Sequence, residues 1–127
     1  MKFFIDNNLS EHLARGMKAF GEDVEHLKDR FPAATSDPEW LQYLGTQGIL
    51  LITRDERVRW RPVELESLLR HKVGAFFLGG KNRNRCELIQ QLVRNWSQMK
   101  DWASKTPRPF AMRVPPQGTK FKRIPLS

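Results

Sequence analysis

Three aspartates stand at positions where a parallel sheet would bring acidic side chains together. Asp6 directly follows the apolar run 3–5, and Asp55 comes two residues after Thr53, which ends the apolar run 49–53. Asp37 opens the predicted helix that leads into that second run. Because sites in open α/β sheets lie at the carboxyl ends of the strands, we expect the three carboxylates to converge at one edge.

Carboxylates that converge repel one another unless a cation lies between them. Mg²⁺ or Mn²⁺ suits such an oxygen-rich site. A bound divalent ion can activate water and stabilise the charge that builds on a phosphate during hydrolysis. The spacing of the aspartates therefore makes them a candidate metal site for phosphodiester hydrolysis.

Each aspartate also has a purely structural interpretation. Asp6 can hydrogen-bond the turn formed by the two asparagines that follow it. Asp37 is a suitable helix cap, and Asp55 can pair with a neighbouring arginine at the surface. One aspartate at a strand end is weak support for a site, whereas the combination of three favours one.

Basic side chains gather after the same predicted strands. One group follows the run 49–53 and the other follows the run 73–78; we expect RNA contacts from Arg54, Arg57, Lys81, Arg83 and Arg85. The Gly79-Gly80 backbone and the start of the next helix can also receive a phosphate. The alternative is that these are ordinary solvated charges.

The length and composition of the chain limit which kinds of protein it can be. The chain has 127 residues, which suits one domain, and 22 Lys and Arg against 14 acids give a net charge of +8. Such a charge attracts polyanions, although solubility alone can explain it. A single cysteine excludes an internal disulfide. No signal peptide or membrane-spanning run is recognisable, so we expect a cytoplasmic protein without a membrane partner.

Strand and helix patterns alternate along the chain. Apolar or alternating runs predict strands at 2–5, 23–27, 49–53 and 73–78, with a last edge strand at 110–114. Amphipathic spacing predicts helices at 9–20, from 37, from 62 towards 71 and at about 83–103. This order indicates a three-layer α/β/α fold with a mostly parallel central sheet of four to five strands.

The ends of these elements are also predicted from local signals. Asn8 is expected to cap the first helix, with Glu11 completing a capping box. Asp37 is expected to cap the second helix, ahead of Pro38. We expect residues 1–105 to form the domain and residues 106–127 to be a basic, proline-rich C-terminal extension.

Three segments together resemble the PIN-like domain family. They are the opening 3–9 with Asp6, the helix start Ser36-Asp37-Pro38-Glu39, and Leu50-Leu51-Ile52-Thr53-Arg54-Asp55. They look most like the small bacterial branch related to VapC-type toxins and the Mut7-C domain. The resemblance covers about residues 1–80.

The resemblance implies an endoribonuclease that depends on Mg²⁺ or Mn²⁺. Asp6, Asp37 and Asp55 would be its metal-binding and catalytic acids, and Thr53 would orient the site by hydrogen bonding. It further implies the toxin half of a toxin–antitoxin pair, with RNA as substrate and an antitoxin protein as partner. Whether the chain forms a homodimer stays open.

The chain departs from the family pattern after the fourth strand. Typical PIN nucleases bring a further acid there, but residues 78–84 contain no carboxylate. Asn7 or Asn82 could act as neutral oxygen ligands in its place. The departure keeps a second hypothesis open: a non-catalytic PIN-like module that binds RNA or a protein partner. A receiver-like domain is a third hypothesis, but it normally pairs two acids near strand one.

Overall fold

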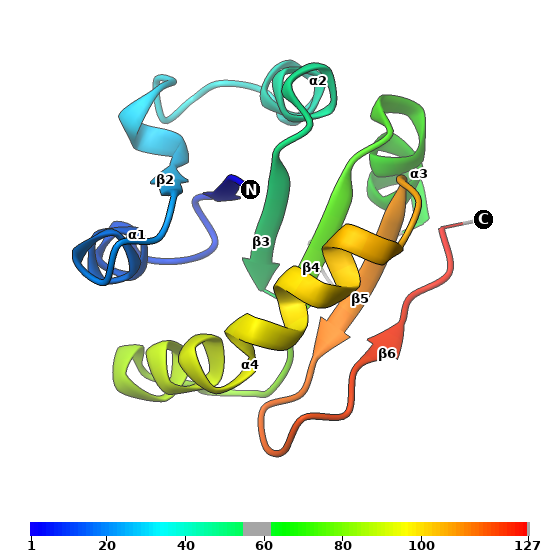
Figure 1. The fold of residues 1–127 in the computed structure, drawn as a ribbon. Coiled ribbons are helices and arrows are strands. Elements are labelled where there is room, and N and C mark those ends of the chain that lie inside the picture. Colours follow the sequence, from blue (N-terminus) through cyan, green and yellow to red (C-terminus); the bar gives the residue numbers. More distant parts are fainter. Residues whose placement is uncertain (55–61, 127) are drawn as a thin grey trace.

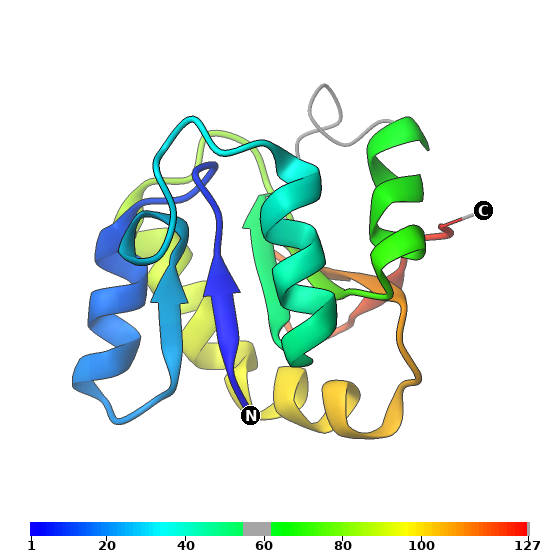
Figure 2. The ribbon, with the colours of Figure 1, turned by 90° about the horizontal axis from the view of Figure 1, so that it is seen from above.

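The computed structural model describes residues 1–54 and 62–126. These residues form one six-stranded sheet with helices on both faces (Figures 1 and 2). The strands are β1 Phe3–Ile5, β2 Val24–His26, β3 Leu50–Arg54, β4 Gly74–Leu78, β5 Phe110–Val114 and β6 Lys122–Arg123. The helices are α1 Glu11–Ala19, the 3-10 helix η1 Leu27–Asp29, α2 Asp37–Gln47, α3 Pro62–His71 and α4 Arg85–Lys105.

The sheet order is β2-β1-β3-β4-β5-β6, in which only β6 is antiparallel to its neighbour among the described strands. The predicted α/β class with a mostly parallel sheet is therefore confirmed. The number of strands differs, because β6 adds a sixth. Its two residues, Lys122 and Arg123, are exposed and basic, so no apolar pattern in the sequence predicts this strand.

Alternation along the strands builds a separate core on each face of the sheet. Phe3 and Ile5 of β1 face α1 and α4, whereas Phe4 between them faces α2. All three side chains are fully buried. Each such burial contributes about 1.5–3 kcal/mol, which explains how the short strand β1 is held between β2 and β3. Figure 1 shows the two helical layers on opposite sides.

The predicted start of the first helix is wrong by two residues. The helix begins at Glu11, and Ser10 caps it by accepting a hydrogen bond from the His12 N–H at 3.1 Å. Asn8 cannot serve as the cap because its own groups bond to Asp6 and Thr53. Tertiary contacts have overridden a local capping signal.

Two other predicted helix features also differ. Ser36 takes the cap position of α2, so Asp37 is the first helical residue and not the cap. The long helix α4 begins at Arg85 after an Asn84–Glu87 capping box. Within α4, Leu92 takes a core position and its neighbour Val93 is 55% exposed.

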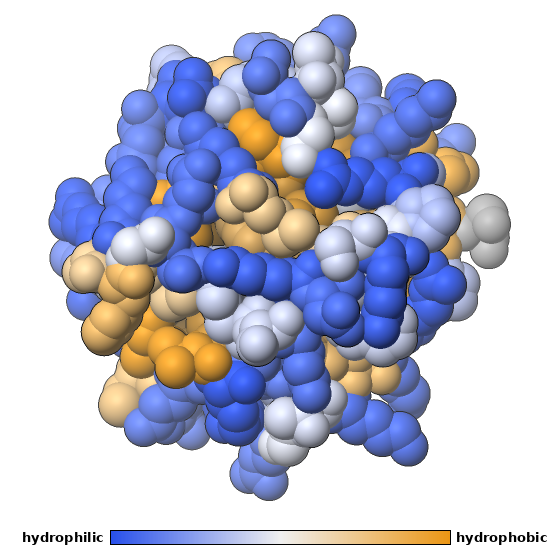
Figure 3. Space-filling model, viewed as in Figure 1, coloured by the Kyte–Doolittle hydropathy of each residue, from blue (hydrophilic) through white to orange (hydrophobic). Residues whose placement is uncertain are grey.

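The C-terminal segment belongs to the sheet. Strand β5 pairs with β4 on one side and β6 on the other, so it is not the edge strand that the sequence pattern predicts. Residues 106–127, expected as an extension, thus supply two strands. Hydrophilic residues cover most of the face seen in Figure 3. Within the described residues, no helix is both long and apolar enough to cross a membrane.

Two helical glycines offer a matched test of the packing between α2 and α3. A Cβ at Gly45 would overlap the backbone carbonyl of His71, whereas a Cβ at Gly16 would meet only the Ile89 side chain, at 3.7 Å. We expect Gly45→Ala to lower the free energy of unfolding by about 1–3 kcal/mol. Gly16→Ala should raise it by about 0.5–1 kcal/mol, because alanine favours the helix.

Urea unfolding followed by circular dichroism measures both changes. An equal effect of the two substitutions would contradict the close approach of α2 to the end of α3.

Candidate active site

The centre of the candidate site is the Asp6 carboxylate, which lies just beyond the end of β1. Its side chain is buried, with 1% exposure. The Thr53 hydroxyl donates a hydrogen bond to Asp6 Oδ2 at 2.8 Å, and the Asn8 backbone N–H donates to Oδ1 at 3.1 Å. Both carboxylate oxygens therefore accept hydrogen bonds from the protein, which fixes the direction in which the group points.

The sheet topology explains why Asp6 and Thr53 meet. Ile5 of β1 is in register with Ile52 of β3, so the residues that follow them also lie side by side. The chain leaves β1 for β2 on one side and returns to β3 on the other, which creates a switch point between β1 and β3. Crevices at the carboxyl ends of strands form at such points.

Asn8 is a site residue that the sequence pattern assigned to a different role. Its side-chain amide donates to Thr53 Oγ1 at 3.3 Å while its backbone N–H bonds Asp6. The Asn7 amide, expected to support the metal site, donates to the Ala33 carbonyl at 3.2 Å and so ties this loop to the segment before α2. The double asparagine after Asp6 was the available signal, but it was equally typical of a turn.

Asp37 lies at the same edge of the sheet as Asp6. It is the first residue of α2, and Figure 2 shows α2 beginning at the edge towards which β1, β2 and β3 point. Asp37 is half-buried. Asp55 and Arg57 lie outside the described residues. Among the residues that are described, no group of three His, Cys, Asp or Glu side chains is placed to hold a metal ion.

A polar cluster around Glu25 holds the segment that leads to Asp37. The Glu25 carboxylate accepts hydrogen bonds from Arg30 Nε and the Tyr43 hydroxyl, each at 3.1 Å, and Lys2 Nζ lies 3.4 Å away. Burial, together with the charge of Glu25, raises the pKa of Tyr43. The hydrogen bond to Glu25 raises the pKa of Arg30. Both groups therefore keep their ordinary protonation at neutral pH, and the cluster acts as a structural link between β2 and α2.

A guanidinium lies at the end of the fourth strand, where typical PIN nucleases carry a further acid. Arg113 of β5 is in register with Phe77 of β4, and its side chain reaches over Gly79. A Cβ at Gly79 would lie only 2.5 Å from Arg113 Cζ, so this approach needs glycine. Sequence reasoning missed Arg113, because a single arginine in an apolar run indicated only an edge strand.

The predicted RNA-binding cations lie in different environments. Lys81 and Arg85 are exposed, and Arg54 is half-buried at the end of β3. The side chain of Arg83 is only 14% exposed, and it bonds Glu87 Oε2 at 3.4 Å and the Pro116 carbonyl at 3.1 Å. Arg83 therefore serves inside the fold, where it ties the turn before α4 to the end of β5.

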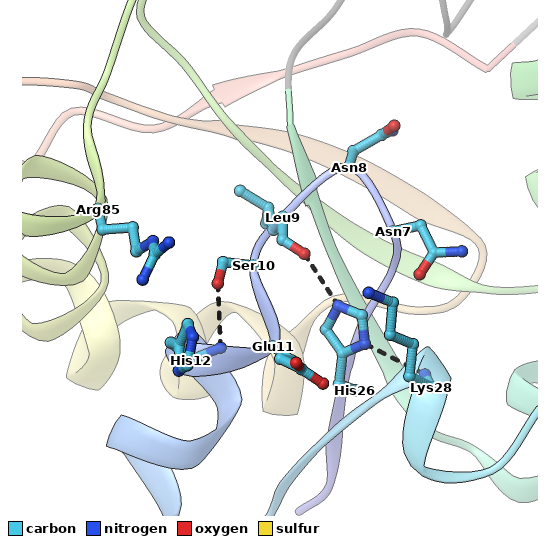
Figure 4. A pocket seen from close by; sticks show the side chains of 9 residues that line it. All are labelled: Asn7, Asn8, Leu9, Ser10, Glu11, His12, His26, Lys28 and Arg85. Carbon is cyan, nitrogen blue, oxygen red and sulfur yellow. Dashed lines mark hydrogen bonds between the residues drawn. The ribbon is translucent and has the colours of Figure 1, made fainter. Parts of the chain in front are cut away.

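Residues 6–10 connect β1 to α1, and we call them the Asp6 loop. A pocket of about 410 Å³ opens beside this loop (Figure 4). Its described lining includes Asn7, Asn8, Ser10, His12, Lys28 and Arg85. We call it the α1 pocket, because it lies at the start of that helix.

His26 forms a fixed wall of the α1 pocket. Its Nδ1 accepts from the Lys28 N–H at 3.1 Å, and its Nε2 lies 2.9 Å from the Leu9 carbonyl. These two partners require the neutral ring with its hydrogen on Nε2. The buried ring thus joins the Asp6 loop to η1.

The fold and this edge define a small α/β domain with a buried acid at the switch point of its sheet. A family model described as "PIN like domain" matches residues 1–80, so the chain belongs to the PIN-like domain family. PIN-like domains are typically nucleases, which makes a nuclease-type module the class of function. Searches of curated proteins and of solved structures found no match.

The hydrogen bond from Thr53 to Asp6 generates a test of the site. Thr53→Val keeps the shape but leaves a buried carboxylate oxygen without that donor. We expect the free energy of unfolding to fall by about 1–3 kcal/mol. Thr53→Ser keeps the hydroxyl and is the matched control. Urea unfolding of the two variants measures the difference, and a Thr53→Val variant as stable as the wild type would contradict a stabilising role of the hydroxyl.

Proposed function

We propose that this protein is a divalent-metal-dependent endoribonuclease that hydrolyses RNA phosphodiester bonds. Asp6, Asp37 and Asp55 would hold Mg²⁺ or Mn²⁺. The observation that carries the proposal is the buried Asp6 carboxylate, oriented by Thr53 and Asn8 at the switch point of the sheet. A carboxylate fixed in this way is costly to bury, and it suits a site where its charge meets a cation.

The donor set fits an oxygen-ligated divalent ion. The Thr53 hydroxyl and the Asn8 N–H hold the two oxygens of the Asp6 carboxylate in a fixed orientation, and carboxylate oxygens are the usual ligands of such an ion. Asp37 adds a carboxylate at the same edge, where the first turn of α2 starts. When bound, the ion would supply an activated water and would offset charge on the phosphate.

The protein's own groups would orient the site and the substrate. Thr53 and Asn8 keep the Asp6 carboxylate aimed, which avoids a reorganisation cost during the reaction. Arg54, Arg57, Lys81 and Arg85 would hold RNA phosphates near this edge. Arg83 contributes indirectly, because its guanidinium is committed to Glu87 and Pro116.

A toxin of the VapC type, neutralised by an antitoxin protein, is the biological role we propose for this nuclease. The support is the resemblance of the three acidic segments to that branch and the net charge of +8, which suits an acidic partner as well as RNA.

A non-catalytic RNA- or protein-binding module is the second candidate. The observation that favours it is Arg113 over Gly79, because a guanidinium lies where typical family members carry an acid. Without that acid, residues 78–84 supply no carboxylate ligand, which weakens metal binding.

Metal binding separates the two candidates. We expect calorimetric titration to show Mn²⁺ binding to the wild type and its loss in Asp6→Asn and Asp55→Asn. Asp23→Asn, which changes an exposed acid at the start of β2, is the control and should bind normally. RNA cleavage should fall at least 100-fold in the two site variants, on the order expected when a catalytic group is lost.

Absence of Mn²⁺ binding in folded wild type, with salt-sensitive RNA binding that survives Asp6→Asn, would replace the nuclease by the binding module. Loss of binding in Asp23→Asn as well would point to non-specific attraction of the cation.

The toxin role predicts a phenotype that depends on Asp6. Induced expression of the wild type in a bacterial host should stop growth, and expression of Asp6→Asn at the same level should not. Asp23→Asn should remain toxic, because its carboxylate is remote from the candidate site. Growth curves with matched protein levels measure this, and toxicity that persists in Asp6→Asn would separate growth arrest from nuclease activity.

A further inference from the structure

We propose that the α1 pocket binds a phosphodiester group of the RNA strand, adjacent to the phosphate at Asp6. This inference deepens the proposed function and rests on it for the identity of the polymer. The pocket adds Lys28 and the start of α1 to the nucleic-acid surface, neither of which the sequence pattern singled out.

The charge of the pocket favours an anionic group. Lys28 and Arg85 are both exposed and line it, and Figure 4 shows them on opposite sides of the Leu9-Ser10 segment. Neither forms an ion pair with any described residue. Glu11 is the acid among the described lining residues. Its Oε2 lies 3.6 Å from Arg15 Nη2, so the negative charge of Glu11 is partly offset. An anion in the pocket would meet two uncompensated cations.

The pocket and the Asp6 site share a wall. Asn8 lines the pocket, its amide bonds Thr53, and the Thr53 hydroxyl bonds the Asp6 carboxylate. The His26 ring fixes the other side, because it holds the Leu9 carbonyl and the Lys28 N–H together. A strand with one phosphate at Asp6 would therefore pass directly over a preformed, positively charged recess.

The lining indicates contact with the backbone of the strand and not with its bases. No aromatic base-stacking platform of the Phe, Tyr or Trp type lines the described pocket, whereas amide, hydroxyl, imidazole and cationic groups do. Contacts of this kind position a nucleic acid without reading its sequence. We therefore infer a sequence-independent phosphate subsite. An acidic protein segment would need the same charges but has no reason to follow the Asp6 edge.

The test measures binding of a short single-stranded RNA by fluorescence anisotropy in EDTA, so that cleavage cannot occur. The variant is Lys28→Ala/Arg85→Ala. The control, Arg70→Ala/Lys105→Ala, removes two exposed cations at the ends of α3 and α4, at the opposite edge of the sheet. Thermal unfolding of each variant checks that it is folded.

The logarithm of the RNA-binding constant falls linearly with the logarithm of the salt concentration, and each single-strand phosphate contact contributes about 0.7 to that slope. We expect the pocket variant to lose two such contacts, so its slope should be shallower by about 1.4, while the control keeps the slope of the wild type. At 0.1 M salt this loss corresponds to RNA binding that is roughly 25-fold weaker. The charge-keeping variant Lys28→Arg/Arg85→Lys should bind within a few-fold of the wild type.

Three outcomes would overturn the inference. They are unchanged RNA affinity of the pocket variant, an equal loss in the control variant, and a loss in the charge-keeping variant as large as in the alanine variant. If the pocket variant binds RNA normally yet the wild type binds Mn²⁺ and cleaves, the pocket fails and the nuclease stands. If no Mn²⁺ binds but the pocket variant loses RNA affinity, the nuclease fails and the pocket stands as an RNA-binding site.

Discussion

The arrangement of this edge of the molecule depends on one buried carboxylate. A polar side chain with 1% exposure is tolerated only when hydrogen bonds replace its water. Thr53 and the Asn8 N–H provide them for Asp6, and Thr53 can do so only because β1 and β3 are neighbours in that register. Asn8 is then engaged and cannot cap α1, so the helix begins later, at Glu11, behind Ser10. Asn8, Leu9 and Ser10, which precede the helix, line the α1 pocket.

Most of the sheet could be predicted from the sequence, and the strands that were predicted wrongly or missed have physical reasons. Strands buried on both faces need continuous apolar runs, as in β3 and β4, and such runs are easily recognised. Strand β6 has no such run, because its two residues are exposed and pair with β5 through the backbone, and so it was missed. Strand β5 was predicted at an edge because Arg113 resembled a solvent-facing charge, although its side chain lies over Gly79.

The candidate site could be predicted only in part. Asp6 follows from the rule that sites form where parallel strands end, and the orienting role of Thr53 follows from the family resemblance. The structure contains a hydrogen bond between them. The role of Asn8 could not be foreseen, because a local cap and a distant hydroxyl compete for the same side chain. Arg85 was among the expected RNA contacts, but Lys28 comes from a separate element, and an isolated exposed base has no periodic signal. Asp55, the third expected ligand, lies outside the described residues, so its role stays a prediction.

The charges at this edge limit how many cations the proposed site can hold. Each divalent ion needs nearby negative charge to replace its water, and carboxylates are the usual source. Residues 78–84, which follow β4, contain no carboxylate, and the Arg113 guanidinium lies over Gly79 at this point. A second ion at the end of β4 would therefore find no carboxylate in that segment to replace its water. Lys28 and Arg85, which line the α1 pocket, are exposed cations that a phosphate can reach. For the nuclease proposed above, this distribution supports a single ion at the β1–β3 switch point, with the RNA backbone held by the protein's own cations.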